Sequence, residues 1–157
     1  MDIMDLDAEI TEGKKRALYL LSRSALLSSD LARKLQARAF SAEAIATVIA
    51  FCTQSGYIND AERVAQLIAK ELNKGRSPRW VYLKLKQKGI DESLLQALCP
   101  TDSTREKEAL ARILRKHAPA LRRSGRDTWQ KWAQKLCRLG FSYESVIEAL
   151  KREDLFS

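Results

Sequence analysis

A segment of fifteen residues occurs three times in the chain, and this repetition limits the possible folds more than any other feature. The copies cover residues 31–45, 81–95 and 132–146 and align without gaps. In each copy a Lys-Leu pair is followed five residues later by Phe or Ile. The leucines of these pairs are Leu35, Leu85 and Leu136. Their offsets of 50 and 51 residues indicate that one structural unit has been duplicated.

The spacing inside the repeat predicts two helices joined by a short turn. Apolar residues four apart, such as Val81 and Leu85, would lie on one face of a helix. Gly89 and Gly140 can adopt the left-handed conformation that ends a helix. Two residues further on, each copy has a side chain suited to the N-cap of the next helix. These predicted caps are Ser41, Asp91 and Ser142.

A further amphipathic helix is expected before each pair. Its three copies are predicted at residues 14–24, 60–73 and 104–117. Either Asn59 or Asp60 would cap the second of these helices. Ser77 and Pro78 would then supply the N-cap and first residue of the next helix.

The connection inside the third unit is expected to be longer than the others. Pro119 and the pair Ser124-Gly125 would bracket this basic connection, and Asp127 would cap the helix that follows. The chain has only six Gly and three Pro residues, which leaves few positions for tight turns. Long helices are therefore favoured over many short strands.

These observations predict an all-α fold, an array of three tandem three-helix repeat units. The expected bounds of the units are 14–59, 60–99 and 104–152. Residues 1–13 hold five acidic and no basic residues, and we expect them to form a flexible N-terminal tail. Each unit is too small to hold a large core alone, so we expect neighbouring units to pack together.

The net charge of +8 hides an uneven distribution. Residues 1–13 contribute −5, so residues 14–157 carry +13. A folded body this basic attracts polyanions, and nucleic acid is the commonest one in the cytosol. The alternative is that the charges only keep a solvated surface soluble.

The basic residues recur at matching places in the repeat, since Lys34, Lys84 and Lys135 occupy the same position. Such a row of cations could follow a partner that also repeats. A single lysine of this kind is equally well explained as part of a solvated helix face. The predicted binding residues are Arg33, Lys34, Arg38, Lys74, Arg76, Arg79, Trp80, Lys84, Lys88, Lys131, Lys135 and Arg138.

Two tryptophans differ in their repeat positions. Trp132 aligns with Leu31 and Val81, which predicts a core residue. Trp80 aligns with polar residues, which favours an exposed ring that could stack on a base or anchor an interface. Cover by the neighbouring unit is an equally good interpretation.

No pattern in the sequence indicates catalysis, a metal or a cofactor. Cys52, Cys99 and Cys137 are far apart, and His117 is the only histidine, so we expect no metal site. The apolar runs are too short to span a bilayer, and the acidic N-terminus does not resemble a signal peptide. We therefore expect a cytoplasmic, monomeric protein that binds no cofactor and no membrane.

Several of these motifs together resemble the RecX regulatory family. The residues that carry the resemblance are Gly56-Tyr-Ile-Asn-Asp60, Arg63-Val-Ala65, Gly75 and Leu85-Lys-Gln-Lys-Gly-Ile90, with Leu31–Phe40 and Ser41-Ala-Glu43 before them. The resemblance covers roughly residues 14–152 and is strongest between Leu31 and Leu98. This chain has Asn59-Asp60 where two acids are common in the family, and its third unit diverges most.

The resemblance implies an elongated fold of tandem three-helix units that modulates the bacterial recombinase RecA. Such proteins bind along the groove of the RecA–DNA filament and suppress strand exchange and ATP hydrolysis. Weak binding to free single- and double-stranded DNA is expected as well. The alternative hypotheses are a stand-alone helix-turn-helix DNA-binding regulator and an enzyme whose site the sequence does not display.

Overall fold

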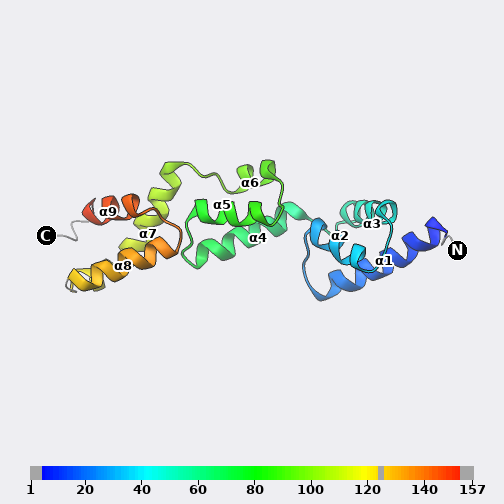
Figure 1. The fold of residues 1–157 in the computed structure, drawn as a ribbon, viewed down its shortest axis with the longest axis horizontal. Helices are drawn as coiled ribbons and strands as arrows, with labels where there is room; N and C mark the ends of the chain where they lie inside the picture. The colour runs from blue at the N-terminus through cyan, green and yellow to red at the C-terminus, as the bar shows by residue number, and fades with distance from the viewer. Residues whose placement is uncertain (1–4, 124–125, 153–157) are drawn as a thin grey trace. The chain divides into compact units, whose positions relative to one another are not determined.

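All regular structure in the part of the chain that the structure describes is α-helical (Figure 1). The computed structural model describes residues 5–123 and 126–152. The helices in these residues are α1 (Leu6–Arg23), α2 (Ser28–Ala37), α3 (Ala42–Gln54), α4 (Asp60–Asn73), α5 (Pro78–Gln87), α6 (Glu92–Leu98), α7 (Ser103–Arg122), α8 (Arg126–Arg138) and α9 (Tyr143–Arg152). The predicted all-α class is therefore confirmed.

The chain divides into two compact bodies, and the division falls inside α4. The first body extends to Gln66 and the second begins at Leu67. In the first body α1, α2 and α3 contact one another. In the second, α9 packs against both α7 and α8, and α5 contacts α6 and α7. The predicted bounds of the three repeat units therefore do not coincide with the compact bodies, and those bounds stay a prediction.

The core of the first body is made by the repeat residues. Its fully or nearly fully buried members are Ala17, Leu31, Leu35, Val48, Cys52 and Ile58. Leu31 and Leu35 lie one turn apart on α2 and face α1 and α3, as their spacing predicts. Burial raises the pKa of the Cys52 thiol, so this cysteine is an apolar core residue and not a reactive one.

The prediction that residues 1–13 form a flexible tail is wrong for residues 6–13, which are the first turns of α1. Asp5 caps this helix by accepting a hydrogen bond from the backbone N–H of Asp7. A carboxylate oxygen of Glu9 accepts from the backbone N–H of Ser41, which ties α1 to the start of α3. At Gly13 an added Cβ would lie 2.8 Å from Val48, so glycine lets the two helices approach closely. Residues 1–4 lie outside the described residues.

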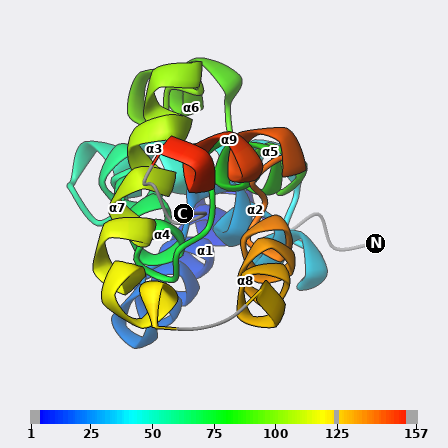
Figure 2. The ribbon, with the colours of Figure 1, turned by 90° about the vertical axis from the view of Figure 1, so that its left-hand side faces the viewer.

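The second body has a core cluster between α7, α8 and α9, the three helices labelled in Figure 2. Its buried residues are Leu110, Leu114, Ala118, Leu121, Trp129, Ala133, Leu136, Phe141, Val146 and Leu150. Leu136 and Phe141 are the repeat residues whose counterparts Leu35 and Phe40 pack in the first body. Trp132 was expected in the core but is only partly buried, at the edge of this cluster.

The turn chemistry of the repeat is confirmed. Gly89 and Gly140 have φ angles of 86° and 104°, which is the left-handed region. The matching position in the first copy is Ala39, a non-glycine residue with a positive φ of 67°. Each of the three caps predicted inside the repeat accepts a hydrogen bond from a backbone N–H of its helix. These caps are Ser41, Asp91 and Ser142.

The structure also decides between the two predicted caps of α4. Asn59 caps the helix, since its side-chain oxygen accepts a hydrogen bond of 3.1 Å from the backbone N–H of Glu62. Asp60 instead accepts hydrogen bonds from the backbone N–H and the hydroxyl of Ser28, and so holds the start of α2.

The predicted connection in the third unit is partly wrong. Helix α7 does not end near Pro119 but continues through it to Arg122. Proline removes one helical hydrogen bond, but Ala118 and Leu121 on either side of it are buried in the core, and this packing stabilises the helix. Helix α8 begins at Arg126, so Asp127 lies in its first turn and is not its cap. Ser124 and Gly125 lie outside the described residues.

Candidate functional site

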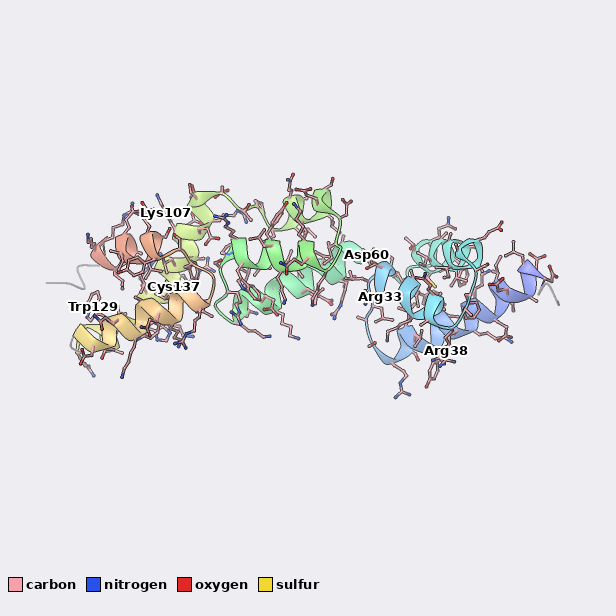
Figure 3. The ribbon with its side chains drawn as sticks, in the orientation of Figure 1. Arg33, Arg38, Asp60, Lys107, Trp129 and Cys137 are labelled. Atoms are coloured by element: carbon pink, nitrogen blue, oxygen red, sulfur yellow. The ribbon has the colours of Figure 1, made fainter. Side chains whose placement is uncertain are left out.

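The predicted basic residues lie mainly on the second helix of each repeat. Arg33 and Lys34 on α2 and Arg38 at its C-cap are all exposed. Figure 3 labels Arg33 and Arg38. Arg33 forms an ion pair with Asp30 at 2.7 Å. Lys34 and Arg38 lie about 40° apart around the helix and form no ion pair with the described residues. Their charges are therefore available to a partner.

On α5 the basic residues divide into two groups. Lys84 and Lys88 are exposed, lie on one face, and form no ion pair within the described part of the chain. Lys86, on the far side, pairs with Glu92 at 3.4 Å. The hydroxyl of Tyr82 also donates a hydrogen bond of 3.0 Å to the Glu92 carboxylate. This hydrogen bond, together with the positive charge of the nearby Lys86, lowers the pKa of the Glu92 carboxyl. Lys84 and Lys88 thus offer unpaired cations on one side of α5.

On α8 the predicted residues form one stripe. Lys131, Lys135 and Arg138 are exposed and follow one another at spacings of four and three, so they share a helical face. The Lys135 ammonium lies 4.8 Å from the centre of the Trp132 ring. That ring contacts His117, with ring centres 4.5 Å apart and ring planes tilted by 43°. Burial and nearby lysines lower the pKa of His117.

Three of the predicted residues meet where α5 begins and α8 ends. The Arg76 guanidinium lies 4.3 Å from the centre of the Trp80 ring. One of its nitrogens also donates to the backbone carbonyl of Arg138 at 3.0 Å. Trp80 is half-buried, and its Cβ packs so closely on Gly140 that a side chain there would clash. Of the two interpretations of Trp80, the structure therefore favours cover by the neighbouring unit.

The remaining predicted residues have local partners. Lys74 forms an ion pair with Glu71 at 3.4 Å. The backbone N–H of Arg79 donates to a carboxylate oxygen of Glu106 at 2.6 Å. Burial raises the pKa of the Glu106 carboxyl, although this hydrogen bond and the Arg79 charge oppose the shift. The run of cations from Lys74 to Lys88 is therefore not one continuous binding face.

Two features of the second body were missed from the sequence. One is a stripe of arginines on α7, Arg105, Arg112 and Arg115, which line adjoining hollows together with Glu108. The other is a groove between α8 and α9 that includes Trp129. The spacing of these arginines along the predicted helix could have revealed the stripe, whereas the groove depends on how α8 meets α9.

The described residues contain no cluster of three His, Cys, Asp or Glu side chains that could hold a metal ion. Among the helices described, none is both long and apolar enough to cross a membrane. Cys99 is buried, its Sγ lies 3.6 Å from the carbonyl oxygen of Pro78, and burial raises the pKa of its thiol. The candidate site among the described residues is thus a set of basic and aromatic side chains on the surfaces of helices.

The chain is similar in sequence to curated regulatory proteins. It is 28% identical over 142 residues to the regulatory protein RecX of Caldanaerobacter subterraneus subsp. tengcongensis, which covers 90% of this chain and 71% of the relative. It is 25% identical over 150 residues to the RecX of Vibrio campbellii, which covers 95% of this chain and 96% of the relative. No protein-family model matches the chain.

Two solved structures share the fold. The crystal structure of RecX from Lactobacillus salivarius superposes with a TM-score of 0.71 at 24% identity, over 94% of this chain and 98% of that one. A second crystal structure of a regulatory protein RecX superposes with a TM-score of 0.67 at 25% identity, over 94% of this chain and 73% of that one.

The fold and the site define a small, basic, all-helical protein whose repeated helices carry exposed cations. The predicted resemblance to the RecX regulatory family is confirmed: the chain is similar in sequence to proteins named regulatory protein RecX, and its fold is that of two RecX crystal structures.

Proposed function

We propose that this chain is a non-catalytic regulator of homologous recombination and DNA repair that binds the RecA–DNA filament. In this role it inhibits the recombinase and ATPase activities of the filament, and it acts in the cytoplasm. The proposal is supported by its likeness to proteins named regulatory protein RecX. It is also supported by the basic character of residues 14–157, which carry +13.

The observation that carries the proposal is the recurrence of one exposed lysine. Lys34, Lys84 and Lys135 each precede a buried leucine of the repeat, and each projects from the second helix of its unit. A partner with a single binding patch would need only one such lysine. A filament presents equivalent phosphates and acidic groups at regular intervals, so it can use all three.

The neighbouring cations extend this row on each helix. They are Arg38 at the C-cap of α2, Lys88 at the C-cap of α5, and Lys131 and Arg138 on α8. Contacts of this kind with phosphate release counterions, so binding should weaken steeply as the salt concentration rises. Arg76 has a different role, because its guanidinium stacks on Trp80 and bonds to Arg138. It positions the start of α5 and the end of α8 and is a poor choice for testing the contact.

The test is a DNA-dependent ATPase assay of RecA with this protein titrated in. We expect inhibition by the wild type at stoichiometric ratios. The variant Lys34→Glu/Lys84→Glu/Lys135→Glu should need about tenfold more protein for the same inhibition, because each reversal removes one counterion-releasing contact.

The matched control is Lys70→Glu/Lys107→Glu/Lys151→Glu. These lysines are exposed and lie outside the repeat position, and both triple variants change the net charge from +8 to +2. Equal loss of inhibition in the two variants would mean that only total charge matters. Wild-type protein that leaves ATP hydrolysis unchanged at stoichiometric ratios would refute the proposed function. Tight, sequence-dependent binding to duplex DNA would instead support a helix-turn-helix regulator.

A further inference from the structure

A groove between α8 and α9 has both apolar and polar walls among the described residues. It has a volume of about 840 Å³, within the range of about 300–1,000 Å³ typical of sites for small organic groups. Its apolar walls include Trp129 and Ala133 from α8 and Leu150 from α9. Trp129 lies near the start of α8 and Cys137 near its end, so the groove follows most of the helix (Figure 3).

An exposed aromatic ring lies in the wall of this groove. Tyr143, the first residue of α9, is 67% exposed, more than any other large hydrophobic residue among those described. Its neighbours Val146 and Leu150 on α9 are buried. An aromatic ring left in water beside an apolar hollow can gain most by stacking on another flat ring.

Polar side chains of α8 also line the groove, and none of those described is acidic. Gln130 and Gln134 lie one turn apart on α8, and each side-chain amide can donate and accept hydrogen bonds. The only charged side chain among the described residues of the wall is Arg138, a cation. Flat rings that carry both donors and acceptors on their edges fit such a wall, and nucleobases have this chemistry.

Cations run along α8 beside the groove. Lys131 and Lys135 each follow one of the two glutamines by a single residue, so they lie about 100° further around the helix. Both lysines are exposed, and neither forms an ion pair with the described residues. A strand whose bases enter the groove would thus have its phosphates next to these two ammonium groups.

We propose that the α8/α9 groove binds the unpaired bases of single-stranded nucleic acid, with Tyr143 as the stacking platform. Gln130 and Gln134 would contact the base edges, and Lys131, Lys135 and Arg138 would contact the phosphates. This inference rests on the proposed function and sharpens it, because it assigns one basic helix to an unpaired strand. An amphipathic helix of a partner protein is the other occupant to consider, but the amide-lined wall and the adjacent cations suit a strand better.

The test compares two labelled strands of equal length by fluorescence anisotropy. One is an oligothymidylate of about twenty nucleotides, and the other is an abasic strand with the same phosphates. We expect the wild type to bind the oligothymidylate about tenfold more tightly than the abasic strand, because stacking adds to the phosphate contacts. Tyr143→Ala should abolish this preference, whereas Tyr143→Phe should keep it.

The matched control is Tyr57→Ala. Tyr57 is 55% exposed, but it lies in the first body. This variant should bind both strands as the wild type does. Equal wild-type affinity for the two strands, or no measurable binding to either, would overturn the inference. So would a Tyr143→Ala variant that keeps the preference.

The inference and the proposed function can fail separately. A protein that inhibits the ATPase but shows no preference for bases would refute only the groove inference. A protein with the base preference that leaves the ATPase unchanged would refute only the proposed function. If Tyr143→Ala loses ATPase inhibition but keeps the base preference, the groove is a docking site for protein and the inference is wrong.

Discussion

The hydroxyl of Ser77 donates a hydrogen bond of 3.1 Å to the backbone carbonyl oxygen of Gly140, which lies 63 residues further along the chain. The same oxygen of Ser77 caps α5 by accepting from the backbone N–H of Trp80 at 3.0 Å. The backbone N–H of Ser77 donates a hydrogen bond of 2.8 Å to the backbone carbonyl oxygen of Leu139. One fully buried residue therefore joins the start of α5 to the turn after α8.

Replacing Ser77 by alanine should lower the free energy of unfolding by about 2–3 kcal/mol. The variant loses an N-cap, worth about 1 kcal/mol, and leaves a buried carbonyl without its partner, which costs about 1–3 kcal/mol. Urea unfolding followed by circular dichroism measures this loss. Ser41→Ala removes the cap of α3 alone and should cost only about 1 kcal/mol. Equal losses in the two variants would show that the bond to Gly140 contributes nothing.

Alanine at the two repeat glycines should have unequal effects. At Gly89 an added Cβ meets no atom within 4 Å, so Gly89→Ala pays only for the positive φ, about 1–2 kcal/mol. At Gly140 the added Cβ would also clash with Trp80, and this clash should cost about 1–3 kcal/mol more. Thermal or urea unfolding of both variants gives the comparison. A smaller loss at Gly140 than at Gly89 would contradict the close packing of these residues.

Glycine in place of Ala39 should stabilise the protein by about 0.5–1 kcal/mol. Ala39 has a φ of 67°, where a side chain costs about 1–2 kcal/mol, so its removal should recover this amount. The greater freedom of glycine in the unfolded chain offsets part of the stabilisation. The midpoint of urea unfolding should rise. Ala37→Gly, two residues earlier in the last turn of α2, should lower the free energy of unfolding by about 0.5–1 kcal/mol and so lower the midpoint. Ala39→Gly that behaves like Ala37→Gly would disprove the prediction.

The stability of the second body should depend on pH near neutrality through His117. The pKa of His117 is lowered in the folded protein by burial and by Lys135 and Lys116, so the unfolded chain binds the proton first as the pH falls. The stability that neutral His117 contributes is present above the unfolded pKa of about 6.5 and is lost as the pH falls from there toward the folded pKa.

Urea midpoints at pH values of about 7.5, 6.5 and 5.5 test this dependence. His117→Phe keeps a ring against Trp132 but cannot titrate, so its midpoint should change less over this range. A wild type and a variant with the same pH dependence would exclude His117 as the cause.

Much of the local structure was predictable, because it depends on hydrogen bonds between residues close in sequence. The caps Ser41, Asp91 and Ser142 and the left-handed turns at Gly89 and Gly140 follow from a few adjacent residues. The buried leucines of the repeat follow from helical spacing in the same way. The errors lie where distant residues decide: Glu9 and Gly13 extend α1 by contacts with α3, and Ala118 and Leu121 carry α7 past Pro119.

In the candidate site, too, the features set by local helical spacing were predictable and those set by tertiary packing were not. The sequence determined by itself that Lys34, Lys84 and Lys135 occupy equivalent exposed positions, because each directly precedes a buried leucine on a regular helix. Only the tertiary structure decided that Arg76 and Trp80 belong to a packed joint with Arg138 and Gly140, and that α8 and α9 leave a groove beside Tyr143. Helical periodicity tells which way a side chain points from its own helix. What it meets there depends on the packing of helices far apart in the chain, which periodicity does not encode.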